Sequence, residues 1–156
     1  MNKTNAMRQL DKAGIKYKTA EYVPDENDLS GVHISEQVGL PPEMMFKTLV
    51  EIGDKKGPLV FCIPVAAELD LKKCAKVAGD KRVELVAVKN LLDLTGYVRG
   101  GCSPIGMKKK FPTFIDETAV LFDDITVSSG MKGCQLIVNA TELISFVDAT
   151  LADLIT

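Results

Sequence analysis

A glycine-rich segment places the strongest limit on how this chain folds. Residues 95–106 read TGYVRGGCSPIG and hold four of the twelve glycines in the sequence. Helices and strands exclude that composition, because each interior glycine costs about 0.5–1 kcal/mol relative to alanine. We therefore predict a loop in which Gly100 and Gly101 let backbone N–H groups approach a ligand, while Pro104 restricts the backbone of Ser103. An anion- or oxyanion-binding loop and an ordinary wide turn both fit these features.

The composition narrows the functional class. Lysine and arginine number 19 against 21 aspartates and glutamates, and the net charge of −2 gives no overall basic surface for nucleic acid. No apolar run approaches the ~20 residues of a membrane span, and the N-terminus has no apolar signal segment. Four widely spaced cysteines without a CxxC motif predict reduced thiols of a cytoplasmic protein, with neither a disulfide framework nor a metal site. His33 is the only histidine, so the usual Ser–His and Cys–His pairs are excluded unless His33 itself serves.

Helical and strand patterns are interspersed along the chain and predict one α+β (mixed α/β) domain over residues 1–156 with one curved sheet. An acidic loop is expected at residues 24–31. The predicted helices cover residues 4–13, one turn at 35–38, 71–78, 88–95 and a C-terminal stripe from 140 to 155. The predicted strands cover residues 17–23, 46–52, 59–63, 83–86, 113–115, 119–122, 124–127 and 134–138.

Lys47 is out of pattern within its predicted strand. It lies between Phe46 and Leu49, on the strand face opposite Phe46, Thr48 and Val50. One interpretation is a charge that protects an edge strand from pairing with another chain. The other is a cation that binds phosphate, ribose or a polarised carbonyl. The residues by themselves favour the first.

Four motifs, in this order and spacing, together resemble the YbaK/EbsC proteins of the YbaK/ProX superfamily. They are Phe46–Leu49 (FKTL), Leu69–Lys73 (LDLKK), Gly96–Gly106 (GYVRGGCSPIG) and Ser128–Gly133 (SSGMKG). The resemblance covers nearly the whole chain. It implies a strongly curved mixed sheet, barrel-like and flanked by helices, and an enzyme that hydrolyses mischarged aminoacyl-tRNA. The implied substrate is Cys-tRNA(Pro), bound by its 3′ end, and the implied partner is prolyl-tRNA synthetase.

The resemblance also implies roles for individual residues. Its implied catalytic positions are Lys47, Gly100, Gly101 and Ser103. Its implied substrate-binding positions are Tyr22, Thr48, Pro104, Gly106, Lys108, Ser129, Gly130, Lys132 and Gln135. Gln135 departs from the family pattern, in which we expect an acid, and this departure weakens any proposal of a carboxylate base there. No metal or cofactor is implied.

The motifs hold no histidine base, metal cluster or carboxylate pair, and the resemblance implies that the substrate supplies its own nucleophile. The cysteinyl thiol would attack its own carbonyl and leave as a cyclic thiolactone. A deacylase that uses water on another small aminoacyl group, such as Ala-tRNA(Pro), is one alternative, and a non-catalytic aminoacyl-tRNA-binding module is another. We predict that Cys102 packs under the loop as a small apolar residue. Lys108–Lys110 is the best candidate for a tRNA phosphate contact.

Overall fold

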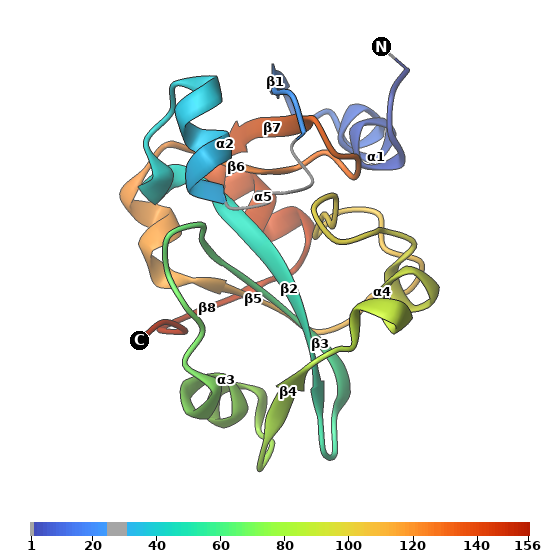
Figure 1. Cartoon of the computed structure of the whole chain (residues 1–156), viewed down its shortest axis with the longest axis vertical. Coiled ribbons are helices and arrows are strands. Elements are labelled where there is room, and N and C mark those ends of the chain that lie inside the picture. Colours follow the sequence, from blue (N-terminus) through green and yellow to red (C-terminus); the bar gives the residue numbers. More distant parts are fainter. Residues whose placement is uncertain (1, 25–30) are drawn as a thin grey trace.

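The computed structural model describes residues 2–24 and 31–156, so most of the predicted acidic loop lies outside the described residues. Its strands form two sheets, which lie one above the other in Figure 1. The smaller sheet is antiparallel, in the order β1 (Tyr17–Glu21), β7 (Cys134–Asn139) and β6 (Asp124–Ser128). The larger sheet is mixed, in the order β4 (Val83–Leu85), β2 (Phe46–Gly53), β3 (Gly57–Pro64), β5 (Thr113–Asp116) and β8 (Thr150–Ala152).

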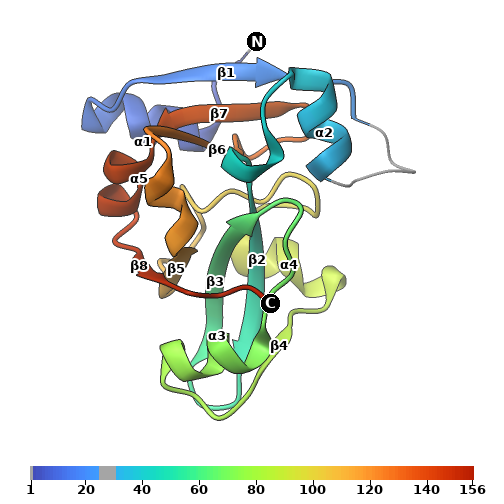
Figure 2. The same ribbon diagram turned by 90° about the vertical axis from the view of Figure 1, so that its left-hand side faces the viewer.

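Five α-helices and two 3-10 helices are found in the described residues. They are α1 (Asn5–Ala13), α2 (Gly31–Val38), η1 (Pro42–Met44), α3 (Leu71–Ala78), α4 (Val88–Thr95), η2 (Glu117–Leu121) and α5 (Ala140–Phe146). Figure 2 shows β1 crossing the top of the molecule with β7 beneath it and α2 at one end. The predicted α+β class is confirmed.

The helix ends follow the signals in the sequence. Thr4, Asp70 and Asn139 cap the N-termini of α1, α3 and α5, and each side chain accepts a hydrogen bond from a backbone N–H of the first turn. Gly14 and Gly79 end α1 and α3 in the left-handed conformation, at φ +74° and +72°. Local capping chemistry therefore sets these boundaries.

Strands β2 and β3 form an antiparallel hairpin and divide the core in two. One apolar cluster holds Phe46, Val50 and Val60, and the other holds Phe61 with Phe114, whose rings stack with centroids 5.1 Å apart. All six residues from Leu59 to Pro64 are buried, so β3 is covered on both faces.

A single bridge between Met45 and Thr126 pairs the segment that leads into β2 with the smaller sheet. The two sheets do not close around it, so the prediction of a barrel-like core is corrected to two separate sheets.

Two predicted elements are wrong. Residues 119–122 belong to η2 and its end rather than to a strand, and Asp116 caps η2 by accepting from Thr118 N. The C-terminal helix ends at Phe146, although apolar residues continue at helical spacing to residue 155. Asp148 takes a positive φ of 56°, and the following residues form β8, which pairs in parallel with β5. Sheet pairing thus overrides the helical pattern.

In addition, α2 begins at Gly31, earlier than the single turn predicted at 35–38.

Glu51 is a buried carboxyl on β2. Its exposed fraction is 0%, and neither carboxylate oxygen has a hydrogen-bond partner in the described part of the chain. Burial, with a smaller contribution from the negative charge of Glu84, raises the pKa of Glu51 to about 7. The folded protein therefore keeps this proton at pH values where an exposed glutamate has lost it.

We predict that Glu51 makes stability fall with rising pH and that Glu51→Gln removes this dependence. The unfolded carboxyl ionises near its ordinary value of 4.5 and the folded one near 7, so the native state binds more protons in between. The free energy of unfolding should then decrease from pH 4.5 to about pH 7. Glu51→Gln should be more stable than the parent above pH 7, by on the order of 2–3 kcal/mol.

Urea unfolding between about pH 4.5 and 8.5 measures this effect. Glu43→Gln, at an exposed position, is the matched control and should keep the parent's pH dependence. Equal free energies of unfolding for the Glu51→Gln variant and the parent at pH 8 would show that ionisation of the buried Glu51 carboxyl does not destabilise the fold.

Candidate functional site

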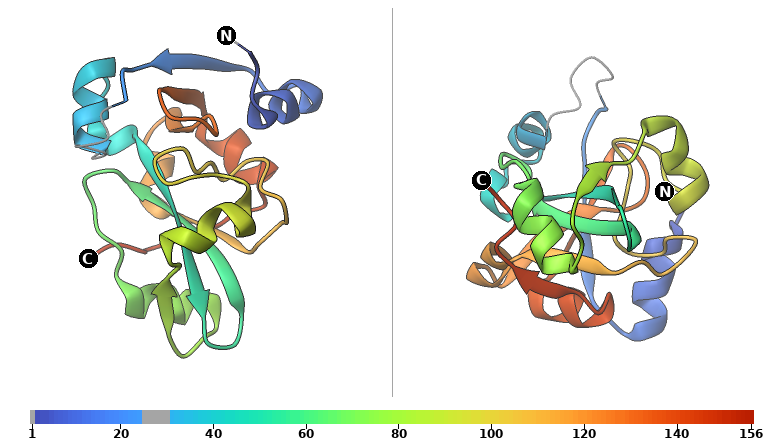
Figure 3. Two further views of the ribbon diagram at one scale, coloured as in Figure 1. Left: turned by 45° about the vertical axis from the view of Figure 1, so that its right-hand side comes forward. Right: turned by 90° about the horizontal axis from the view of Figure 1, so that it is seen from below.

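The two glycine-containing loops of the sequence motifs are in backbone contact. A Cβ atom built on Gly101 would lie 3.2 Å from the Lys132 N atom and 3.3 Å from both Cα and C of Met131. The loop after α4 lies next to the turn between β6 and β7, as Figure 3 shows in its left view. Segments 30 residues apart in the sequence therefore form one surface, and Gly101 is required there for close approach.

Tyr97 holds this pair of loops together. Its buried hydroxyl donates to the backbone oxygen of Ile105, and its N–H donates to Thr95 Oγ1 at 3.0 Å. A Cβ atom on Gly130 would lie 2.8 Å from Tyr97 Cε1, and one on Gly106 would lie 2.8 Å from the Tyr97 hydroxyl. Sequence reasoning did not single out Tyr97 or Thr95. The available signal was an aromatic residue inside a glycine-rich loop.

The loop is further shaped by its own hydrogen bonds. The Gly101 N–H donates to Val98 O at 3.0 Å, so this donor serves the turn itself. Ser103 is fully buried, and its hydroxyl oxygen accepts from Ile105 N at 3.3 Å. Gly100 has a φ of +87°, which favours glycine. The loop is therefore preformed by internal bonds.

The loop is also attached to its neighbours. The Gly106 carbonyl accepts from Asn5 Nδ2 at 3.2 Å, which joins the loop to α1. The Lys108 N–H donates to Thr95 O at 3.0 Å, and the Lys108 side chain packs over Gly96. Pro104, between these attachments, is buried.

A row of buried polar side chains lies on one face of the smaller sheet. Ser128 and Gln135 are paired across β6 and β7, and Thr126 lies two residues before Ser128, so the three share a face. Thr126 Oγ1 donates to Gln135 Oε1 at 3.3 Å, and Ser128 Oγ accepts from Gly130 N at 3.2 Å. This face is opposite the apolar core cluster, which holds Leu136. Gln135 supplies a neutral amide where the family pattern led us to expect an acid.

Lys47 belongs to the same face as this polar row. Met45 pairs with Thr126, and Lys47 follows Met45 by two residues, so its side chain is on the Thr126 side. Lys47 is half-buried, and burial lowers its pKa while the nearby carboxylate of Glu68 opposes that shift. The desolvated ammonium differs from a solvated charge that protects a strand edge.

Thr48 is on the other face of β2 from Lys47. Its hydroxyl lies 3.7 Å from Cys62 Sγ, next to the apolar core cluster. Strand alternation thus separates Thr48 from Lys47, as predicted, although both residues were expected at the substrate.

Cys102 packs beneath the loop, as predicted. It is 8% exposed and belongs to the apolar core cluster. Burial raises the pKa of the Cys102 thiol to about 12, although a hydrogen bond with Thr95 opposes that shift. The side chain is therefore a protonated thiol at neutral pH, which is a poor nucleophile.

The other predicted site residues adjoin the second loop. The Tyr22 N–H donates to Gly133 O at 2.9 Å, so the end of β1 is next to this loop. Ser129 is fully buried, and its N–H donates to Cys134 O at 3.1 Å. Lys132 contributes the backbone that contacts Gly101.

Two kinds of structural feature are absent from the described residues. Within residues 2–24 and 31–156, no three histidine, cysteine, aspartate or glutamate side chains gather in a way that would hold a metal ion. In the same residues, no helix has the length and apolar character needed to cross a membrane.

Comparisons with known proteins agree on one family. A family model described as an aminoacyl-tRNA editing domain matches residues 31–146. The chain is 44% identical over 154 residues to the protein named "Putative Cys-tRNA(Pro)/Cys-tRNA(Cys) deacylase EbsC" from Enterococcus faecalis, covering 99% of this chain and 94% of that one. It is 28% identical over 101 residues to a proline–tRNA ligase of Thermodesulfovibrio yellowstonii, which covers 65% of this chain but 17% of the ligase.

Solved structures share the fold. The structure described as "a putative trans-editing enzyme for prolyl tRNA synthetase" has a TM-score of 0.85 at 23% identity, covering 100% of this chain and 99% of the other. A hypothetical protein has a TM-score of 0.88 at 18% identity, covering 98% of this chain and all of the other. The fold is that of an aminoacyl-tRNA editing domain. The chain belongs to the YbaK/EbsC family of such domains, and the resemblance carried by its four motifs is confirmed.

We predict a graded loss of function as Gly101 is enlarged. Gly101→Ala must displace the backbone at Met131 and Lys132 by a few tenths of an ångström, and Gly101→Val must displace it further. Deacylation of mischarged aminoacyl-tRNA should fall partly in the alanine variant and by on the order of a hundredfold in the valine variant, because small misplacements of a positioned substrate are costly.

Gly14→Ala is the matched control for glycine loss, because a Cβ there meets nothing within 4 Å although φ is +74°. It should lower the melting temperature and leave turnover by the folded protein unchanged. Normal turnover by Gly101→Val would show that contact between the loops is not needed for function.

Proposed function

We propose that this protein is a trans-editing deacylase that hydrolyses the ester bond of Cys-tRNA(Pro). The observation that carries the proposal is the backbone contact at Gly101 between the two motif loops, the second of which begins at Ser128 of the buried polar row. The 44% identity to EbsC over nearly the whole chain supports the same activity. We further propose that residues 1–156 act as one domain, in the cytoplasm.

Such an enzyme corrects errors that arise because a synthetase pocket cannot fully discriminate between similar amino acids. Cysteine and proline are similar in size, and small differences in an apolar pocket discriminate only by about 10- to 200-fold. A second site that removes the wrong product raises the accuracy. The low net charge of −2 favours recruitment of the tRNA through a complex with prolyl-tRNA synthetase.

The mechanism that we propose uses the substrate's own thiol. The cysteinyl sulfur attacks the ester carbonyl carbon, the bond from that carbon to the tRNA 3′ oxygen breaks, and the thiol proton ends on the 3′ hydroxyl. The products are a four-membered thiolactone and free tRNA, and water opens the thiolactone afterwards. The protein then has to position the ester and stabilise the oxyanion. The protonated state of Cys102 supports a mechanism without a protein nucleophile.

Each part of the site has a role in this scheme. Lys47 binds the terminal phosphate of the tRNA, where its partial desolvation strengthens the interaction. The loop from Gly100 to Gly106 surrounds the ester, with its backbone fixed by Tyr97. Gln135 provides a neutral hydrogen-bonding wall that leaves the substrate thiol without a competing carboxylate.

We predict that Lys47→Ala loses most deacylation and keeps the fold. The side chain is half-buried without packing at the centre of a core, so stability should change little, whereas removing one electrostatic contact to the substrate costs about 10²–10³ in turnover. Single-turnover hydrolysis of Cys-tRNA(Pro) measures the effect. Lys76→Ala, at an exposed position on α3, is the control. Full activity of Lys47→Ala would refute the assigned role.

We predict that Cys102→Ala retains activity within a fewfold of the parent and releases thiolactone as the parent does. Deleting a true nucleophile would lower turnover by a thousandfold or more. Trapping the released product separates the alternatives, because only cysteine and its homologue can form a thiolactone. Hydrolysis of Ala-tRNA(Pro) at a comparable rate would instead indicate a deacylase that uses water, and no turnover of either substrate would indicate a binding module.

A further inference from the structure

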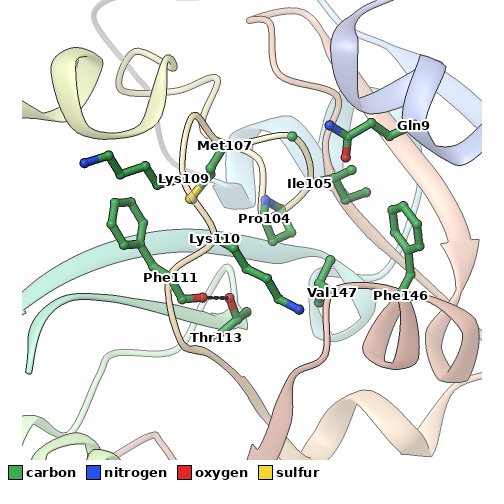
Figure 4. Close-up of a pocket in the computed structure, with 11 residues that line it drawn as sticks. Gln9, Pro104, Ile105, Met107, Lys109, Lys110, Phe111, Thr113, Phe146 and Val147 are labelled. Carbon is green, nitrogen blue, oxygen red and sulfur yellow. Dashed lines mark hydrogen bonds between the residues drawn. The ribbon is translucent and has the colours of Figure 1, made fainter.

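The glycine-rich loop also forms one wall of a pocket that the proposed reaction does not use. The pocket has a volume of about 270 Å³ and is formed by three separate segments. Its lining includes Gln9 of α1, residues 104–107, 109–111 and 113 of the stretch that leads into β5, and Phe146 and Val147 at the end of α5. Figure 4 shows Phe111 and Phe146 on opposite sides of the opening, with Lys110 between them.

The pocket walls are held in place before any ligand binds. Thr113 Oγ1 donates to the backbone oxygen of Phe111 at 3.0 Å, which fixes the start of β5 (Figure 4). On the loop side, Tyr97 bonds to Ile105, and Asn5 bonds to Gly106. A preformed pocket binds without the cost of ordering its walls.

The chemistry of the lining points to one nucleotide. Phe111 and Phe146 are half-buried aromatic side chains, and aromatic rings stack on nucleobases of any sequence. Lys109 and Lys110 are exposed cations at the rim, in a run of three lysines. The volume lies just below the range of about 300–1,000 Å³ for drug-sized ligands, so it suits a single unit of a longer polymer.

The ion pair between Lys110 and Asp148 does not prevent phosphate binding. Lys110 Nζ lies 3.6 Å from Asp148 Oδ2, and the two side chains are 73% and 83% exposed. Solvent-exposed ion pairs at this distance contribute little, so a phosphate can replace the carboxylate at small cost.

We propose that this pocket binds a nucleotide of the single-stranded acceptor end of the tRNA, with the base between Phe111 and Phe146 and the phosphate on Lys109 and Lys110. The inference rests on the proposed function for the identity of the nucleic acid. Residues 104–106 line the pocket and also belong to the glycine-rich loop that contains Gly101. A nucleotide bound in the pocket would therefore steer the aminoacyl ester toward Gly101.

The test uses the intact protein and the non-acylated RNA tetranucleotide ACCA as the probe. Calorimetric titration gives its Kd at several salt concentrations between about 50 and 200 mM. The double variant Lys109→Gln/Lys110→Gln should weaken binding about tenfold and reduce the slope of log Kd against log salt by one to two. Lys55→Gln/Lys56→Gln makes the same charge change at the tip of the β2–β3 hairpin and should have little effect.

The role of aromatic stacking is tested by a second pair of variants, one in the pocket and one control. Phe146→Leu keeps an apolar side chain but removes the stacking surface, and it should weaken ACCA binding by about fivefold or more. Phe122→Leu is the control, because Phe122 is half-buried against the same core cluster and does not line the pocket. Equal Kd values for the two leucine variants, or equal losses in the two lysine pairs, would overturn the proposal.

These outcomes are separable from failure of the proposed function, because ACCA binding requires no catalysis. If the parent binds ACCA through Lys109, Lys110 and Phe146 but does not hydrolyse Cys-tRNA(Pro), the pocket stands and the reaction is wrong. If the parent hydrolyses Cys-tRNA(Pro) and the pocket variants bind ACCA as the parent does, the pocket assignment alone is wrong.

Discussion

The site depends on how closely two backbones approach each other around Tyr97. Gly101 lies against the backbone of residues 131–132, and Gly106 and Gly130 leave room for the tyrosine ring and hydroxyl. Any side chain at these three positions would displace either the ring or the facing loop. The glycines are therefore needed for packing between segments, and the shape of the loop follows from that packing as much as from its own turns.

Strand β2 contributes to both the core and the site, because its successive side chains point to opposite faces of the sheet. Phe46, Thr48 and Val50 face the apolar cluster, and Lys47 faces the polar row of the smaller sheet. The core residues fix the strand rigidly, and this rigidity positions the lysine. Partial burial on its own face of the strand lowers the pKa of Lys47, so packing and electrostatics act on one residue.

Local signals in the sequence predicted much of the fold, because helix caps and the β2–β3 hairpin are set by nearby residues. The C-terminal helix was overextended, because the apolar spacing up to residue 155 gave no sign that β8 would pair with β5. The motif loops were located correctly, whereas their contact at Gly101 is set by tertiary packing. Opposite faces for Lys47 and Thr48 were predicted from strand alternation. That Lys47 faces the polar row could not be predicted, since this depends on the pairing of Met45 with Thr126.

The pairing of β1 with β7 has a consequence for biosynthesis. β1 spans Tyr17–Glu21, and its partner β7 spans Cys134–Asn139. In addition, Leu69 pairs with Ile155 near the C-terminus. The smaller sheet thus joins early and late parts of the chain. A nascent chain carries β1 unpaired until β7 is made, and the apolar strand β3 unpaired on one side until β5 is made. Such non-local topology folds slowly and exposes strand edges meanwhile, so this small protein is expected to rely on chaperones that shield emerging chains.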